Sequence, residues 1–174
     1  LTGTVFDTTT ATGLTISNAP DIDIGDSNNT LSGNVTFMGA GKTFGDFTVK
    51  KHAGDFDCII TGANTFGAVT LETPDATYQY SDIQFPISVT TTLTSLVAQG
   101  TATYPINILS STSGTAATLS DTTGANSIRY CTVKDSTVTG GATWTALNST
   151  NVSGNTGWTF SAGWSQWLKR RIGF

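Results

Sequence analysis

Short apolar segments recur along the chain, and residues that favour turns separate them. Most segments run for four or five residues between Gly, Asn, Ser and Thr. Such runs are typical of β-strands, whereas an amphipathic helix repeats its apolar residues at spacings of three and four over a longer stretch. The pattern predicts about a dozen strands. They are expected near 13–18, 21–25, 34–38, 46–50, 57–61, 68–72, 78–85, 87–98, 106–110, 116–120, 127–135 and 157–160.

A repeat links two of these segments. Residues 33–50, GNVTFMGAGKTFGDFTVK, align with residues 55–72, DFDCIITGANTFGAVTLE, at an offset of 22 residues. The alignment lays the predicted strand 35–38 over residues 57–60. A chain that repeats in this way can stack one turn on the next at about 4.8 Å, so that strands of successive turns pair with each other.

Within the repeat, three apolar residues keep the spacing i, i+3, i+5, which departs from the strict alternation of a straight strand. A corner explains the extra residue, because the chain bends there while the flanking residues still point inward. We expect Phe44 and Phe66 to stack one above the other in the core. The spacing occurs at Phe44, Phe47 and Val49; Phe66, Val69 and Leu71; Leu93, Leu96 and Ala98; and Ile128, Cys131 and Val133.

These patterns predict an all-β fold, namely a right-handed parallel β-helix (a β-solenoid) over residues 1–160 with a C-terminal aromatic cap. Residues 161–174 are expected to form this cap or an interface tail. An antiparallel β-sandwich is the alternative, because the period drifts within TPDATYQYSDIQFPISVTTT in the middle of the chain. Since the chain begins with Leu1, we also expect it to be a piece of a longer protein.

Composition agrees with strands and argues against two kinds of partner. Charged residues make up 11% of the chain, against about 25% in an average soluble domain. The net charge is −4, and clustered basic residues occur only near the C-terminus. Nucleic-acid binding is therefore not expected, because phosphate contacts need grouped Lys and Arg. No apolar run approaches the length of about 18 residues that a membrane span requires.

Carboxylates near the N-terminus form the one candidate metal site. Oxygen ligands at alternate positions can hold Ca²⁺, but the twelfth position of a calcium loop would fall on Ser32, which carries no carboxylate. We favour a strand with Ile22 and Ile24 inward and the acidic side chains in solvent. No metal or other cofactor is therefore predicted. The candidate ligands are Asp21, Asp23, Asp26 and Asn28.

A catalytic role is not expected. Asp55 and Asp57 are the closest approach to the paired carboxylates of glycoside hydrolases. The only histidine, His52, follows Lys50 and Lys51 and is expected to be solvated on a turn. No combination of nucleophile, base and orienting residue is apparent.

The two cysteines, Cys58 and Cys131, each lie in an apolar segment that reads as a strand. A disulfide between them is an open alternative. We favour two buried free thiols, because isolated cysteines in such segments usually behave as small apolar residues.

The C-terminal segment GWTFSAGWSQWLKRRIGF concentrates aromatic and basic residues. Aromatic side chains mixed with Arg suit an interaction surface. A cap over the end of the stack, or a contact between subunits, is favoured over a membrane anchor. The candidate interface residues are Trp158, Trp164, Trp167, Arg170 and Arg171.

Residues 130–160, YCTVKDSTVTGGATWTALNSTNVSGNTGWTF, resemble the closing segment of repetitive β-helical proteins in phage genomes and bacterial surface proteins. Such segments pair a Y-C-T-V-K-D-S turn with G-G-A-T-W and end in N-T-G-W-T-F. Residues 62–71, GANTFGAVTL, are similar to the internal repeats of the same proteins. The resemblance implies a right-handed β-helix in a phage tail fibre, spike or other virion surface component, often trimeric, and it transfers no catalytic residue.

We therefore expect an extracellular phage virion structural protein, in a tail fibre, spike or surface adhesin, that assembles passively with copies of itself, a homotrimer being favoured. Other virion proteins and a host surface glycan are the further expected partners. Two alternatives stay open: an adhesin or filament subunit of a bacterial cell surface, and a polysaccharide-degrading tailspike.

Overall fold

The computed structural model describes residues 3–7, 18–25, 33–54 and 57–162. These residues form short strands joined by turns, and none of them is helical. The branched side chains of Thr, Val and Ile favour strands, and Gly and Asn supply the turns. The strands are β1 (Gly3–Asp7), β2 (Ile22–Ile24), β3 (Val35–Met38), β4 (Phe47–Val49), β5 (Asp57–Thr61), β6 (Ala68–Leu71), β7 (Asp82–Phe85), β8 (Thr90–Thr92), β9 (Ser95–Ala98), β10 (Ile106–Ser110), β11 (Ala117–Ser120), β12 (Ala125–Arg129), β13 (Cys131–Lys134), β14 (Ser136–Thr139), β15 (Thr143–Leu147), β16 (Thr150–Ser153) and β17 (Thr159–Ser161).

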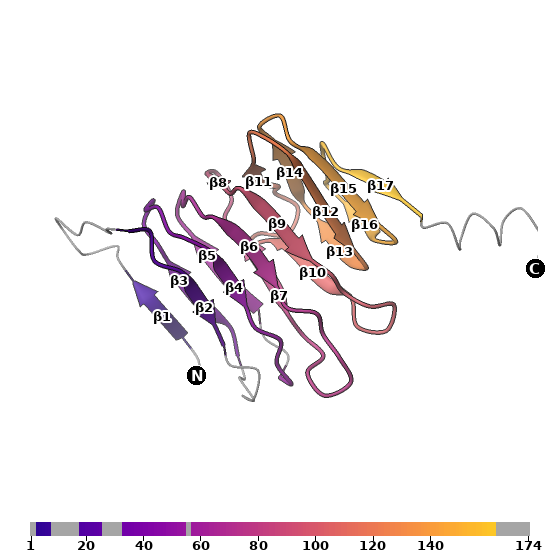
Figure 1. Cartoon of the computed structure of the whole chain (residues 1–174), viewed down its shortest axis with the longest axis horizontal. Coiled ribbons are helices and arrows are strands. Elements are labelled where there is room, and N and C mark those ends of the chain that lie inside the picture. Colours follow the sequence, from indigo (N-terminus) through magenta and orange to yellow (C-terminus); the bar gives the residue numbers. More distant parts are fainter. Residues whose placement is uncertain (1–2, 8–17, 26–32, 55–56, 163–174) are drawn as a thin grey trace, which may run out of the picture.

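The strands form four parallel sheets that the chain visits in turn (Figure 1). Sheet 1 has the order β1-β3-β5-β7-β10-β13-β16, sheet 2 the order β14-β11-β8, sheet 3 the order β2-β4-β6-β9 and sheet 4 the order β12-β15-β17. We call one passage from sheet 1 back to sheet 1 a layer; β10, β11 and β12 make one layer and β13, β14 and β15 the next. A bridge between Gln99 and Arg129 continues sheet 3 into sheet 4.

The layers are not joined equally. The layers β10–β12 and β13–β15 share three full ladders. Nearer the N-terminus, single bridges replace sheet 2, from Thr43 to Thr65 and from Thr65 to Thr92. At the other end the bridge from Thr137 to Thr156 takes the same place.

All of the sheet ladders between these strands are parallel. The antiparallel sandwich is therefore wrong. Parallel neighbours need a long connection between them, and here the chain supplies it by passing through the other sheets before it returns.

The predicted corner spacing is confirmed. All members of the four i, i+3, i+5 sets are buried. In the third set the corner lies between β8 and β9, and in the fourth it lies at Tyr130, whose φ is 49°. Each set thus places one apolar residue before a bend and two after it, and all three point into the core.

The offset of 22 residues holds in sheet 3 but not in sheet 1. Phe47 pairs with Val69, and Val49 pairs with Leu71, as the alignment predicts. In sheet 1, however, Val35 pairs with Cys58, at an offset of 23 residues. The predicted overlay of 35–38 on 57–60 is therefore wrong by one residue, because a one-residue slip would turn apolar side chains outward.

Phenylalanine rings fill the core of the N-terminal layers. The rings of Phe44 and Phe66 stack with centroids 5.6 Å apart and an interplanar angle of 25°, so the predicted stack is confirmed. Phe37 meets Phe44 and Phe47 edge to face, each at 5.1 Å. Aromatic pairs at these distances contribute about 0.5–1.5 kcal/mol beyond the burial of their area.

Both cysteines are free and buried, as predicted. Burial raises the pKa of the Cys58 thiol well above its usual range and that of Cys131 to about 12. The thiols lie in sheet 1 as inward residues of β5 and β13. They therefore serve the core as small apolar side chains.

Candidate binding site at the loop edge

Two long loops leave the stack where strands of sheet 3 lead into strands of sheet 1. Residues 72–81 join β6 to β7, residues 99–105 join β9 to β10, and both loops extend from the lower side of the stack in Figure 1. In the next two layers the same connection shrinks to Tyr130 and then to residues 148–149. We call this edge of the molecule the loop edge.

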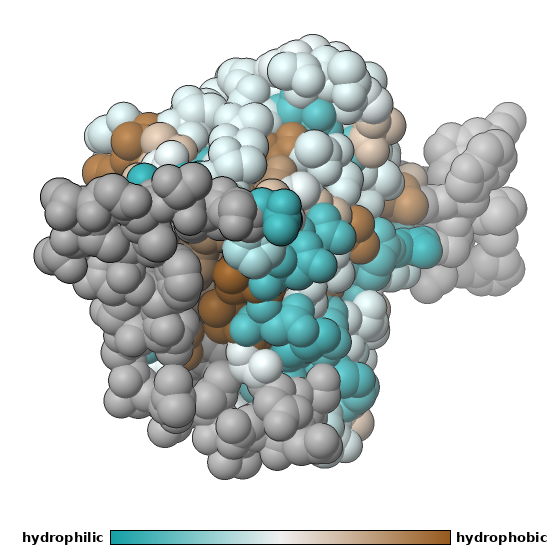
Figure 2. Space-filling view, turned by 60° about the vertical axis from the view of Figure 1, so that its left-hand side comes forward, coloured by the Kyte–Doolittle hydropathy of each residue, from teal (hydrophilic) through white to brown (hydrophobic). Residues whose placement is uncertain are grey.

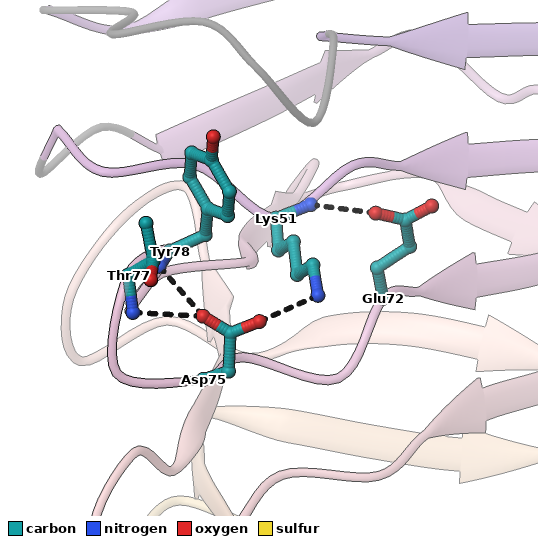
Figure 3. Close-up of polar contacts among 5 residues, drawn as sticks. All are labelled: Lys51, Glu72, Asp75, Thr77 and Tyr78. Atoms are coloured by element: carbon teal, nitrogen blue, oxygen red, sulfur yellow. Dashed lines mark hydrogen bonds and ion pairs between the residues drawn. The ribbon is translucent and has the colours of Figure 1, made fainter.

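Asp75 closes the first of these loops on itself (Figure 3). Its Oδ1 accepts the backbone N–H groups of Thr77 at 2.8 Å and Tyr78 at 2.9 Å, and its own N–H donates to the Tyr78 carbonyl at 2.8 Å. Its Oδ2 accepts a hydrogen bond from Lys51 Nζ at 2.7 Å. The Lys51 ammonium and the two N–H donors lower the pKa of Asp75 to about 2.

Glu72 ties the start of the same loop to the preceding turn. Its Oε2 accepts the Lys51 backbone N–H at 3.1 Å, and its Oε1 lies 3.3 Å from Lys50 Nζ. The hydrogen bond that Lys50 donates to Glu72 raises the pKa of Lys50, and the one that Lys51 donates to Asp75 raises the pKa of Lys51. Because such exposed pairs add little to stability, their main effect is to position the loop.

An open cleft of about 270 Å³ lies between the two loops. Two half-buried tyrosines, Tyr80 from the first loop and Tyr104 from the second, belong to its wall. The remaining wall is made of amide, hydroxyl and proline side chains. The cleft is lined by Gln79, Tyr80, Thr103, Tyr104, Pro105 and Asn107.

His52 supports Tyr80 from behind, and the prediction that it is solvated is wrong. Its side chain is completely buried. The backbones of His52 and Tyr80 exchange two hydrogen bonds, at 3.0 and 3.2 Å, and their rings stack at 6.1 Å. The loop 72–81 folds back over the turn that carries His52, which the spacing of neighbouring lysines does not reveal.

The other side of the cleft is equally fixed. Tyr104 and Thr101 close a tight turn, because the Thr101 N–H donates to the Tyr104 carbonyl at 3.0 Å and the Tyr104 N–H donates to Thr101 Oγ1 at 2.9 Å. Asn107 is held by the buried Asp82, which accepts its backbone N–H at 2.8 Å and its side-chain Nδ2 at 2.9 Å. The cleft is therefore built from side chains whose backbones are already ordered.

A second cleft, of about 490 Å³, lies beyond the loop 99–105 over the short turns. Its lining reaches Ala162, the last residue that the structure describes, and we assign no site to it. Its lining residues are Ala102, Tyr130, Asn148, Ser149, Phe160, Ser161 and Ala162.

The predicted strand, with Ile22 and Ile24 inward and the acidic side chains in solvent, is confirmed for the residues that the structure describes there. Ile24 is buried and Asp21 and Asp23 are exposed. Asp21 Oδ1 accepts the Asp46 N–H at 2.8 Å, and Asp23 lies 3.6 Å from Lys50. Asp26 and Asn28 lie outside the described residues. Within the described part of the chain, no three potential metal-ligating His, Cys, Asp or Glu side chains come together.

Of the paired carboxylates, Asp57 lies in β5 and its Oδ2 accepts a hydrogen bond from Gln84 Nε2 at 2.6 Å. Asp55 is outside the described residues. The cleft at the loop edge is formed without either residue.

Trp158 is the one predicted interface residue that falls in the described part of the chain. It is partly buried, packs edge to face on Trp144 at 5.3 Å and donates a hydrogen bond from Nε1 to Ser136 Oγ at 3.1 Å. Trp164, Trp167, Arg170 and Arg171 lie outside the described residues, so the cap stays a prediction.

Comparisons with protein-family models, with curated proteins and with solved structures found no match to this chain. No helix within the described ranges is long and apolar enough to cross a membrane.

Sequence reasoning missed all of the residues that line the cleft. The available signal was the drift of the period at TPDATYQYSDIQFP, which marks the insertion of the loop 72–81. Interruptions of a repeat map to loops on one face, which is often the binding face. Tyr80 could have been found by asking what the interruption contains, whereas Tyr104 lies outside it, in the loop 99–105.

Proposed function

We propose that the protein is a phage virion structural protein, a component of a tail fibre, spike or surface adhesin, built as a right-handed parallel β-helix over residues 1–160. It works passively, on the virion surface, in assembly with copies of itself and with other virion proteins. A trimer is the favoured assembly. The right-handed winding follows from the strong preference of about 98% of parallel crossovers for that hand.

One observation carries this proposal: apolar residues of successive layers stand in register and are buried. In sheet 3, Ile24 pairs with Val49, Val49 with Leu71, and Leu71 with Ala98. A column of this kind grows by adding layers, since each layer covers the inner face of its neighbours. Such a rigid rod suits a fibre or spike.

The native mass of the particle tests the assembly, measured by light scattering after size-exclusion chromatography and by native mass spectrometry. We expect a trimer that persists on dilution into the micromolar range. A chain that stays monomeric at high concentration would overturn the assembled-fibre proposal. Electron micrographs of phage labelled with an antibody to this chain would test its place on the virion.

The two rival functions are separable from this one. Genes next to the coding sequence distinguish a bacterial adhesin or filament subunit from a virion protein. We propose that the chain is not an enzyme; a capsule depolymerisation assay that detects activity, abolished by Asp55→Asn or Asp57→Asn, would overturn this and favour the tailspike alternative.

A further inference from the structure

We propose that the cleft between the loops 72–81 and 99–105 binds one residue of an uncharged saccharide. The inference deepens the proposed surface role and rests on it in one respect, namely that the loop edge meets a host glycan. The juxtaposition that carries it is two ordered tyrosines, from two different loops, facing one small cleft with amide side chains.

The chemistry of the cleft wall fits a sugar better than an anion. A pyranose ring presents an apolar face of C–H groups, which packs on an aromatic ring, and hydroxyl groups, which exchange hydrogen bonds with amides and phenols. Tyr80 and Tyr104 offer rings and hydroxyls, and Gln79 and Asn107 offer amides. None of the lining residues is Asp, Glu, Lys, Arg or His, so nothing in the wall pairs with a phosphate or a carboxylate.

The backbone that carries the wall is ordered before any ligand arrives. Tyr80 is held through His52, Tyr104 through Thr101, and Asn107 through the buried Asp82, as described above. Gln79 Nε2 also donates a hydrogen bond to the Ala76 carbonyl, at 3.3 Å. Ordering that is complete in the free protein is not a cost of binding. Ligands that bind weakly, such as single sugars, depend on a site that needs no further ordering when they bind.

The size of the cleft sets the length of the ligand. A volume of about 270 Å³ lies just below the range of about 300–1,000 Å³ that is usual for drug-sized ligands. It accommodates a single sugar ring, and the open mouth leaves the rest of a glycan chain outside. A polyproline peptide, which also packs on aromatic side chains, needs a longer groove of several residues.

The charged residues of the loop edge lie outside the cleft wall. Figure 2 shows one face of the molecule, coloured by hydropathy. Strongly hydrophilic residues gather in bands on the surface turned toward the viewer, beside scattered apolar residues. At the loop edge the Lys51 ammonium pairs with Asp75, while Glu72 pairs with Lys50 and accepts the Lys51 backbone N–H. These charged side chains thus shape the loop, and the wall of the cleft contains none of them.

The test is a titration of the full chain, labelled with ¹⁵N, with methyl glycosides of glucose, galactose, mannose and N-acetylglucosamine, followed by NMR. Glucuronic acid and a proline-rich peptide serve as separate arms. We expect at least one neutral glycoside to shift the amide signals of residues 79–80 and 103–107, with a Kd of about 1–10 mM. The acid is expected to bind more weakly than its neutral counterpart, glucose.

Matched variants assign the effect to the cleft. Tyr104→Ala should weaken binding by at least about tenfold, because it removes one ring of the wall, whereas Tyr104→Phe keeps the ring and should stay within about threefold. Tyr78→Ala is the control, since Tyr78 belongs to the loop 72–81, which also carries Tyr80, but does not line the cleft. Should Tyr104→Ala not fold, Thr103→Trp, which fills the cleft from an exposed position, should abolish the shifts.

The outcomes separate this inference from the function it rests on. Absence of shifts with all four neutral glycosides overturns the inference, as do shifts that map away from the cleft, wild-type affinity in Tyr104→Ala, or binding of the peptide alone. If the protein assembles but binds no sugar, only this inference is overturned and the fibre assembly stands. If the protein stays monomeric but binds sugar in the cleft, this inference stands and the fibre assembly is overturned.

Discussion

The strand stack and the loop edge are held together in different ways. In the stack each contact has a counterpart in the layer above or below: Phe44 on Phe66, and Phe47 opposite Val69. At the loop edge each contact occurs once, such as the bond of Asp75 to Lys51. The stack repeats, whereas the loop edge presents to solvent a cleft of mixed aromatic and amide side chains.

The difference teaches where sequence variation is tolerated. A layer must match its neighbours in register and in the inward residues, so changes there propagate along the stack. The connection at the loop edge has no such constraint, and its length falls from residues 72–81 to the lone Tyr130 within two layers. A loop can therefore change there without altering the stack, which is a common arrangement for binding sites.

The largest effect is expected from a charge in the column. Phe66→Asp removes a buried ring and leaves an unpaired carboxylate in its place, so we expect the free energy of unfolding to fall by at least about 4 kcal/mol. Thr70→Asp, on the outward side of the strand β6 that follows Phe66, should cost less than about 1.5 kcal/mol. Urea titrations followed by circular dichroism measure both, and equal midpoints for Phe66→Asp and the parent would refute the inward assignment of Phe66.

A corner of the stack and a turn outside it should respond differently to the same change. An added Cβ at Gly140 would overlap the Asp121 carbonyl oxygen, whereas at Gly114 it meets nothing within 4 Å. Both residues have positive φ, 101° and 84°, which alone costs Ala about 1–2 kcal/mol. Gly140→Ala should therefore lower stability by at least about 2 kcal/mol more than Gly114→Ala. Equal chemical denaturation midpoints would mean that the corner is not tightly packed.

At the loop edge the expected effects are local. Asp75→Ala removes the acceptor of two loop N–H groups, so the amides of Thr77 and Tyr78 should exchange with solvent severalfold faster while the thermal midpoint hardly moves. Asp75→Asn keeps an acceptor oxygen and should show the smaller change. Hydrogen exchange followed by NMR compares the two. A large fall of the thermal midpoint together with unchanged amide exchange would contradict this role.

Acid should have the same local effect in the wild-type chain. The folded pKa of Asp75, about 2, lies below the usual value of about 3.9, so the ionised turn is fully formed above about pH 5 and is lost as the pH falls toward 2. Chemical shifts of Thr77 and Tyr78 should therefore titrate in this range. In Asp75→Asn the signals of Thr77 and Tyr78 should not titrate in this pH range. A titration that persisted in this variant would show that another group causes it.

The smallest effect on the stack is expected from a test of the two cysteines, because this test substitutes no residue. Burial raises the pKa of both thiols, so a thiol reagent at pH 8 should modify them at least about 100-fold more slowly in the native protein than in urea. Rapid modification of either residue in native buffer would show that its layer opens. Mass spectrometry of the modified protein distinguishes Cys58 from Cys131.

The spacing of apolar residues was enough to predict the interior of the stack. Burial decides which side of a strand faces inward, and the positions of Leu93, Leu96 and Ala98 record that choice locally in the sequence. The predicted register of sheet 1 was wrong by one residue, because an alignment of similar residues does not show how many residues the turns between strands need. The pairing of Val35 with Cys58 restores the inward alternation.

The candidate site could not be predicted in the same way. His52 is buried by a loop that joins two layers, and Tyr80 and Tyr104 meet across two loops of different length. No local pattern encodes such a meeting, since it depends on where the stack places the ends of each loop. The interruption of the repeat marks the place but not the contacts.

The unequal joining of the layers has a mechanical consequence. In this stack the inter-strand hydrogen bonds run along the long axis, so tension on the two ends loads every bond between two neighbouring layers at once. The interface between β10–β12 and β13–β15 carries three full ladders, whereas in the neighbouring interfaces a single bridge replaces one ladder. Under load the stack should part on either side of this pair of layers, which would come away as one block.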